Sequence, residues 1–265
     1  MTQSAVSARI RLLEETMGTA LFNRRRNEIQ LTRAGERLKQ HAETIVAAWQ
    51  RALADAALDE GHKLALAVGA IPTLWDGLLQ KWLQRLCQRR PDLALQAESH
   101  GSEALVRKVA NGGLDLAFQF EPTHLENRVV SEVALIDLVM VASRPDIGAQ
   151  TALQEGYILV DCGGSFSAAH ARYFPHAPLP TFRIGLGKVA LGLMLDCGGS
   201  GYLPRDLAVE GMAAGRLFEV RDAPVIDRRV YTVYQAHGEG RTLVEEALAL
   251  FPDDGVPACY SRSSR

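Results

Sequence analysis

The stretch QSAVSARIRLLEETM, residues 3–17, is followed directly by GTALFNRRRNEIQLTRAGE, residues 18–36. In the first segment apolar side chains recur at spacings of four, three and four, which predicts one stripe on a helix. They are Val6, Ile10, Leu13 and Met17. Thr2 and Gly18 suit the N-cap and the C-terminal stop of this helix. The second segment places three arginines and Asn27 between two short apolar segments, which predicts a two-stranded wing with a basic tip.

Charge is distributed unevenly along the chain. The 265 residues are 47% apolar and carry a net charge of −2, which allows a sizeable core and more than one domain. Residues 1–40 hold eight Lys/Arg and four Glu, a local charge of +4 that leaves −6 for the remainder. This distribution favours an anionic partner for the N-terminal end only.

The face opposite the apolar stripe is polar and built from small side chains. It carries Ser4, Ser7, Ala8 and Arg11, with Arg9 at its edge. Small and hydroxylic side chains let a helix lie close to base edges, and arginines reach guanines or phosphates. The pattern therefore favours a DNA-reading helix. The alternative is an ordinary surface helix followed by a solvated basic turn.

Residues 2–36 closely resemble the DNA-binding segment of LysR-type transcriptional regulators. The matching positions are Gln3-Ser4-Ala5-Val6-Ser7, Ile10, Leu13-Glu14, Gly18, Leu21-Phe22, Arg24, Leu31-Thr32 and Ala34-Gly35. The resemblance implies a winged helix-turn-helix whose second helix, about 3–16, enters the major groove of double-stranded DNA. The residues expected in the groove are Gln3, Ser4, Ser7, Arg9 and Arg11. Those expected on phosphates or in the minor groove are Arg24, Arg25 and Arg26.

Members of that family usually begin earlier, with a first helix and the first half of the helix-turn-helix. Residues 1–33 would then be a partial winged helix-turn-helix, through a start-site error, a deliberate shortening or a natural truncation. Each apolar side chain left without its packing partner forgoes roughly 1.5–3 kcal/mol of burial. We therefore expect this segment to be loosely folded and to bind DNA weakly.

A long helix is predicted from Thr32, a candidate N-cap, to about Leu58, with Gly61 ending it. Residues 34–61 would form a linker whose apolar positions alternate at spacings of three and four, as in a heptad seam. The seam is formed by Leu38, Ala42, Ile45, Trp49 and Ala52, continued by Ala56. It favours a partner helix over a single amphipathic helix lying on its own domain. The LysR resemblance implies the same pairing, in a homodimer or homotetramer that reads a two-fold related operator.

Strands and helices alternate through residues 62–252, which predicts an α/β body with mostly parallel sheets. Two long strands, at about 129–143 and 228–235, would connect two lobes. Lobe I would comprise about 62–136 and 230–252, and lobe II about 137–229, followed by a tail over 253–265. The resemblance implies a two-lobed effector-binding domain of the type 2 periplasmic-binding-protein kind.

A cleft between the lobes would suit a small-molecule effector, such as a carboxylate. Thr73 and Ser102 each begin a predicted helix, where hydroxyls and free N–H groups attract carboxylates. The alternative is that both only cap their helices. Phe166 and His170, one helical turn apart, would close over the effector; the alternative is a packed aromatic and a solvent-facing histidine. In LysR-type regulators, residues at the places of Thr73 and Ser102 commonly contact the inducer.

Motifs of catalysis and cofactor binding are absent from the sequence, and its seven histidines lack metal-ligand spacing. We expect no enzyme, cofactor or metal. DCGGS occurs twice, so Cys162 and Cys197 could approach each other and sense oxidants, although two unrelated Gly-rich turns explain the repeat equally. Without a signal peptide or a run of about 20 apolar residues, the bacterial regulator is expected in the cytoplasm, away from membranes. The rivals are a solute-binding protein and an interaction protein that dimerises without binding DNA.

Overall fold

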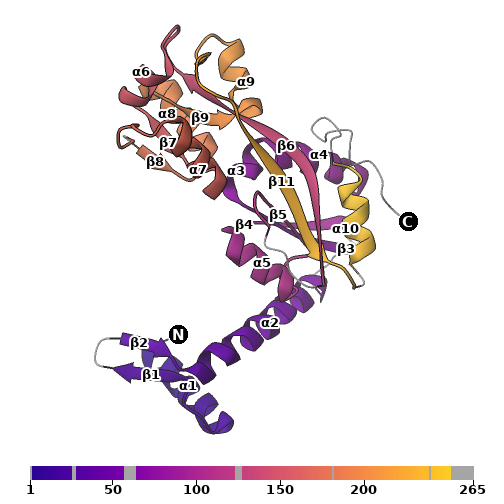
Figure 1. Cartoon of the computed structure of the whole chain (residues 1–265). Coiled ribbons are helices and arrows are strands. Elements are labelled where there is room, and N and C mark those ends of the chain that lie inside the picture. The colour runs from indigo at the N-terminus through magenta and orange to yellow at the C-terminus, as the bar shows by residue number, and fades with distance from the viewer. Residues whose placement is uncertain are drawn as a thin grey trace. The chain divides into compact units, whose positions relative to one another are not determined.

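The computed structural model describes residues 2–25, 28–56, 64–122, 127–180, 182–238 and 240–251. The chain divides into two compact units, the first built on Met1–Ala56 and the second beginning at Ala57 (Figure 1). Within the described ranges, every helix is too short or too polar to cross a bilayer.

The first unit opens with a helix and a hairpin, as predicted. Helix α1 (Gln3–Met17) ends at Gly18, whose φ of 65° is the left-handed conformation that glycine adopts at low cost. Strands β1 (Phe22–Arg25) and β2 (Glu28–Leu31) pair antiparallel, with Phe22 opposite Leu31. Thr2 occupies the N-cap position, but its hydroxyl bonds Ser4 Oγ at 3.0 Å instead of a backbone N–H, so the predicted side-chain cap does not form.

Helix α2 (Arg33–Ala56) is the predicted linker helix. Thr32 caps it, since the Gly35 N–H donates to Thr32 Oγ1 at 3.0 Å. The hydroxyl of Thr32 also donates to the carbonyl oxygen of Ala20 at 2.8 Å. Gly35 allows the close approach of the two segments, because a Cβ there would lie 2.2 Å from the carbonyl oxygen of Leu21. The predicted end of the helix, from Leu58 to Gly61, lies outside the described residues.

The second unit is organised around a seven-stranded sheet in the order β10-β6-β11-β5-β3-β4, with β9 added on β6. The strands are β3 (Leu64–Ala70), β4 (Leu93–Ser99), β5 (Leu116–Gln119), β6 (Arg128–Ala142), β9 (Ser200–Pro204), β10 (Phe218–Glu219) and β11 (Ile226–Gln235). A separate pair, β7 (Ile158–Val160) and β8 (Phe182–Ile184), is parallel. Figure 1 shows β6 and β11 running side by side along this unit.

The prediction of mostly parallel sheets is wrong. Strand β3 pairs parallel with β4 and β5, but β6 and β11 pair antiparallel with each other and with their other neighbours. The physical reason is that the chain passes between the lobes once in each direction, and these two passages hydrogen-bond to each other. A strand that leaves and a strand that returns are necessarily antiparallel.

The hydrophobic core is divided between two lobes, which confirms the predicted two-lobed α/β body. The core of lobe II is formed by buried residues between Leu138 and Ile226, and the core of lobe I by residues before and after that range. Lobe I carries α3 (Pro72–Leu74), the π-helical turn η1 (Trp75–Leu79), α4 (Gln80–Arg89), α5 (Ser102–Ala110) and α10 (Arg241–Leu248). Lobe II carries α6 (Ala149–Gln154), α7 (Gly164–Tyr173), α8 (Gly187–Cys197) and α9 (Arg205–Ala213).

Candidate DNA interface and interlobe cleft

The polar face of α1 is open to solvent. The side chains of Gln3, Ser4, Arg9 and Arg11 are exposed, and Ser7 is half-buried. All five therefore lie on one short helix, and four of them can meet a partner without any rearrangement of the unit. The opposite stripe is also largely uncovered, with Val6, Leu13 and Met17 between 38% and 47% exposed.

Glu14, which the sequence analysis named only as a position matching the LysR pattern, joins α1 to the wing. Oε1 of Glu14 accepts hydrogen bonds from the backbone N–H groups of Leu21, at 2.7 Å, and Phe22, at 3.0 Å. Leu21 is buried, and its carbonyl accepts the N–H of Thr32 at 2.9 Å. Recognition helix, wing and linker are thus connected through one short segment.

In the wing, the backbone of Arg24 and Arg25 lies at the end of β1, next to the turn of the hairpin. Arg24 pairs with Ile29 and Arg25 with Glu28, directly before the turn. Arg26 lies outside the described residues. The backbone of Arg24 and Arg25 therefore belongs to a regular antiparallel pair of strands.

The predicted seam of α2 forms an exposed apolar face on this unit. Ile45 is 69% exposed and Trp49 is 64% exposed, and Val46 and Leu53 add to the same uncovered surface. Ala42 and Ala52 are exposed and Leu38 is half-buried. An exposed tryptophan and isoleucine one turn apart form the kind of apolar surface that a partner helix covers.

In the second unit, Thr73 joins the two lobes. It is buried, and its Oγ1 donates to the carbonyl oxygen of Asp161, just beyond β7, at 3.1 Å. Ile71 occupies the N-cap position of α3, so Thr73 is not the cap itself. Ser102 is exposed and is the first residue of α5, as predicted.

Phe166 and His170 lie on α7 in an aromatic cluster of lobe II. Phe166 is fully buried, with its ring 5.6 Å from that of Tyr202, so in this structure it packs in the core instead of facing a ligand. The Nε2 atom of His170 is 2.8 Å from the hydroxyl of Tyr157, and partial burial lowers the pKa of this histidine. In this structure Phe166 and His170 therefore do not close over a ligand site. Phe166 is the packed aromatic of the alternative, but His170 is half-buried and does not face solvent.

A buried cluster of charges around Arg228 and Glu121 was not predicted from the sequence. Arg228 on β11 is only 5% exposed, and its Nη1 and Nη2 each lie 3.0 Å from Oε1 of Glu121. The same guanidinium lies over the ring of Phe120, 4.5 Å from its centroid. Desolvation acts to raise the pKa of Glu121, but hydrogen bonds from Ser165 and Arg228 outweigh it and lower that pKa below its ordinary value.

A second group of contacts joins the lobes through helices η1 and α4. Oδ2 of Asp76 accepts the N–H of Lys188 at the start of α8, at 3.0 Å. Lys188 Nζ donates to Gln80 at 3.0 Å, and Lys81 pairs with Asp206 at 2.8 Å. Lobe I thus supplies carboxylates to the first turns of two lobe II helices, Asp76 to α8 and Glu121 to α7.

Two family descriptions match the chain. "LysR substrate binding domain" matches residues 59–254, and "Bacterial regulatory helix-turn-helix protein, lysR family" matches residues 1–36. The chain belongs to the LysR family. It is a DNA-binding transcriptional regulator of LysR type, and its second unit is the two-lobed effector-binding domain of that family.

Relatives and solved structures agree with this assignment. The transcriptional regulator HdfR of Yersinia enterocolitica is 32% identical over 257 residues, covering 94% of this chain and 86% of its own. Full-length CbnR in complex with target DNA has a TM-score of 0.64 at 18% identity, covering 95% of this chain and 91% of its own. Full-length LysG from Corynebacterium glutamicum with bound effector Arg has a TM-score of 0.57 at 18% identity, covering 97% and 90%. At these identities the two structures show the shared LysR fold.

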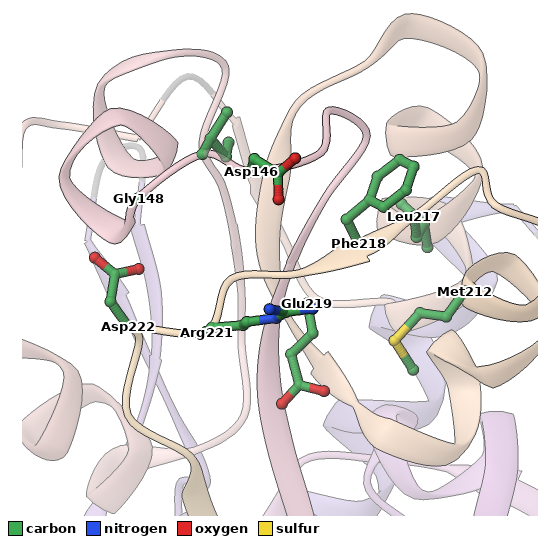
Figure 2. Close-up of a pocket in the computed structure, with 9 residues that line it drawn as sticks. Asp146, Gly148, Met212, Leu217, Phe218, Glu219, Arg221 and Asp222 are labelled. Atoms are coloured by element: carbon green, nitrogen blue, oxygen red, sulfur yellow. The ribbon is translucent and has the colours of Figure 1, made fainter.

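Lobe II of this LysR regulator also has an open pocket of about 750 Å³. Figure 2 shows its lining, which includes Asp146, Met212, Leu217, Glu219 and Asp222. The carboxylate of Asp222 is already used, because it accepts the N–H of Ala149 at the start of α6. None of the residues expected to bind the effector lines this pocket.

In the described part of the chain, the cysteines of the LysR effector domain form no disulfide. Cys162 is buried in the core of lobe II, and Cys197 is exposed at the end of α8. Burial raises the pKa of the Cys162 thiol to about 12. Across the described ranges, His, Cys, Asp and Glu side chains nowhere form a group of three suited to a metal ion.

Proposed function

We propose that this regulator reads operator DNA with the polar face of α1 and the arginines of the wing. The observation that carries the proposal is the Glu14 connection, because it fixes the wing beside the helix whose exposed face bears Gln3, Ser4 and Arg11. A helix in the major groove and a basic hairpin on the backbone need such a fixed relation to contact one duplex together. The solved complex of CbnR with its target DNA supports this use of the fold.

Pairing through α2 completes the proposal for DNA recognition. The exposed face of Ile45 and Trp49 would be covered by the same face of a second chain, with Leu38, Ala42 and Ala52 along the seam. A two-fold pair presents two α1 helices to two half-sites.

A small polar effector is proposed to bind between the two lobes and to shift the two DNA-binding segments of the dimer on the operator. Thr73 and Ser102 lie after the carboxyl ends of β3 and β4, where ligands of open α/β sheets bind. LysG was solved with its effector Arg bound, which supports a small charged molecule in this fold. Phe166 and His170 would not contact the effector; they would act indirectly, by shaping the core of lobe II.

Fluorescence anisotropy tests DNA recognition in the full chain. The duplex from upstream of its own gene is compared with a scrambled duplex at about 50 mM and about 200 mM salt. Preference for the upstream duplex, lost in Arg11→Ala, would support the proposal. Equal and strongly salt-dependent binding to both duplexes would indicate that α1 contacts only the phosphates.

The second candidate is a dimerising protein that does not read DNA. It is favoured by the uncovered stripe of α1, where Val6, Leu13 and Met17 remain exposed. A chain that dimerises by sedimentation yet shows no preference between the two duplexes would establish it.

A further inference from the structure

The guanidinium of Arg228 is a buried cation in the interlobe region. Its side chain is 5% exposed, and both terminal nitrogens lie 3.0 Å from one oxygen of Glu121. The hydroxyl of Ser165 contacts both the guanidinium and that same oxygen. The Nε of Arg228 has no hydrogen-bond partner within the described part of the chain. Removing the anion from such a cation is costly, because the charge would remain buried without a partner.

The three residues come from three different parts of the fold. Glu121 follows β5 in lobe I, Ser165 is in the first turn of α7 in lobe II, and Arg228 lies on the strand that connects the lobes. The N–H of Ser165 also donates to Glu121 Oε1, at 2.8 Å. First-turn N–H groups have no acceptor within their own helix, so this position favours an anion.

The backbone at Gly163 lies close to this guanidinium. Gly163 has a φ of +90°, and a Cβ there would lie 3.0 Å from Nη2 of Arg228. A side chain at this position would therefore crowd the guanidinium. Asp161 is occupied elsewhere, since its Oδ1 accepts the N–H of Gly163 at 3.0 Å.

We propose, building on the proposed effector cleft, that Arg228, Ser165 and the start of α7 form a carboxylate-binding subsite. Glu121 fills this subsite in the ligand-free regulator, and the carboxylate of the effector replaces it. The exchange keeps Arg228 paired throughout, because one carboxylate leaves as another arrives. Glu121 can leave because its side chain is 50% exposed, whereas Arg228 is held in the interior. Its departure frees the end of β5 from α7, so that ligand binding and lobe contact are linked.

Chemical rescue of the full-length chain tests the subsite. Glu121→Ala removes roughly the atoms of acetate, so acetate is the probe. The variant is expected to unfold about 5–10 °C below wild type, because Arg228 loses its anion. Acetate should restore about half of that loss, relative to sodium chloride at the same ionic strength. Adding Arg228→Met to the variant should abolish the response to acetate.

Glu132→Ala is the matched control. Glu132 pairs with the neighbouring arginine of β11, Arg229, at 2.9 Å, but the side chain of Arg229 is 56% exposed. The guanidinium of this second ion pair is therefore solvated without its partner, so acetate should have no effect on the Glu132→Ala variant. Equal responses of the Glu121→Ala and Glu132→Ala variants to acetate would overturn the proposal.

Glu121→Gln provides a second test that does not depend on Glu121→Ala folding. It keeps the size of the side chain but removes the competing charge, so acetate should bind about tenfold more tightly than to wild type by calorimetric titration. Equal affinity in the two proteins would show that Glu121 does not occupy the acetate site. Both tests omit DNA, so their failure is distinguishable from failure of operator binding.

Discussion

Glu14 and Leu21 are joined by a hydrogen bond of 2.7 Å from the backbone N–H of Leu21 to the carboxylate of Glu14. The neighbouring N–H of Phe22 uses the same oxygen. A single side chain therefore sets where the wing leaves the recognition helix. In the proposed mode of DNA binding, this carboxylate fixes the relation of α1 to the wing, although it lies outside the predicted contact surface.

Glu14→Ala is expected to lower operator affinity by at least about tenfold. Loss of charge-assisted hydrogen bonds to two N–H groups costs about 1.5–3 kcal/mol, and the wing loses its fixed position. Anisotropy with the upstream duplex measures the effect. Glu15→Ala, at an exposed neighbouring position, is the control. Equal affinities of the two variants would remove Glu14 from the recognition unit.

Gly35→Ala should destabilise the N-terminal unit by about 1–3 kcal/mol, because the added methyl group would overlap the Leu21 carbonyl. Hydrogen exchange of α1 and α2 reports on this unit separately. Gly192→Ala on α8 is the matched control, since a Cβ there meets nothing within 4 Å. It should be neutral or stabilising by up to about 1 kcal/mol. Unchanged exchange in Gly35→Ala would contradict the close approach.

Ile45→Asp should weaken the proposed dimer by about 100-fold or more, because a two-fold seam would bury two unpaired carboxylates together. Analytical ultracentrifugation measures the dissociation constant. Gln50→Asp adds the same charge at an exposed position away from the seam and should leave assembly unchanged. Equal dissociation constants would place the interface elsewhere.

The lowered pKa of Glu121 predicts a pH dependence of stability. Because its folded-state pKa lies below the ordinary value of 4.5, the ion pair stabilises the fold above that pH. The contribution is lost as the pH falls through the folded-state pKa. Wild type should therefore lose more stability than Glu121→Gln between about pH 5 and pH 3. Urea unfolding at each pH measures the difference, and parallel curves would refute the linkage.

Cys162 should resist alkylation in the native state. Burial raises the pKa of its thiol to about 12, so the reactive thiolate is scarce at pH 8, and the sulfur is covered by the core of lobe II. Iodoacetamide followed by peptide mass spectrometry should modify Cys87 and Cys197 first, because both are exposed. Rapid labelling of Cys162 without unfolding would contradict its core position.

Local elements were predictable from short stretches of sequence. Helix α1 has the predicted bounds and α5 begins at Ser102 as predicted, because apolar spacing and flanking residues are local signals. The π-helical turn at Trp75–Leu79, within the helical segment predicted to begin at Thr73, has no such signal. Which side of a helix faces the core also depends on tertiary packing. For this reason the sequence could not show that Phe166 is buried and does not face a ligand.

Long-range pairings could not be read from the sequence. Glu121 and Arg228 are separated by 107 positions, and each alone resembles an ordinary surface charge. Parallel or antiparallel pairing could not be predicted for the same reason, because the sequence of a strand does not identify the strand to which it hydrogen-bonds. An arginine at an inward position of an alternating strand was the available signal, with Arg228 between the buried Ile226 and Val230.

Strands β6 and β11 remain paired from Ile226 and Leu138 at one end to Gln235 and Arg128 at the other, with one irregularity between Val230 and Tyr231. Such a ribbon resists stretching, since its hydrogen bonds fix every residue against its partner, but it can twist and bend where the register shifts. The lobes can therefore change their angle far more readily than their separation. The proposed effector, bound between the lobes, would therefore rotate one lobe against the other.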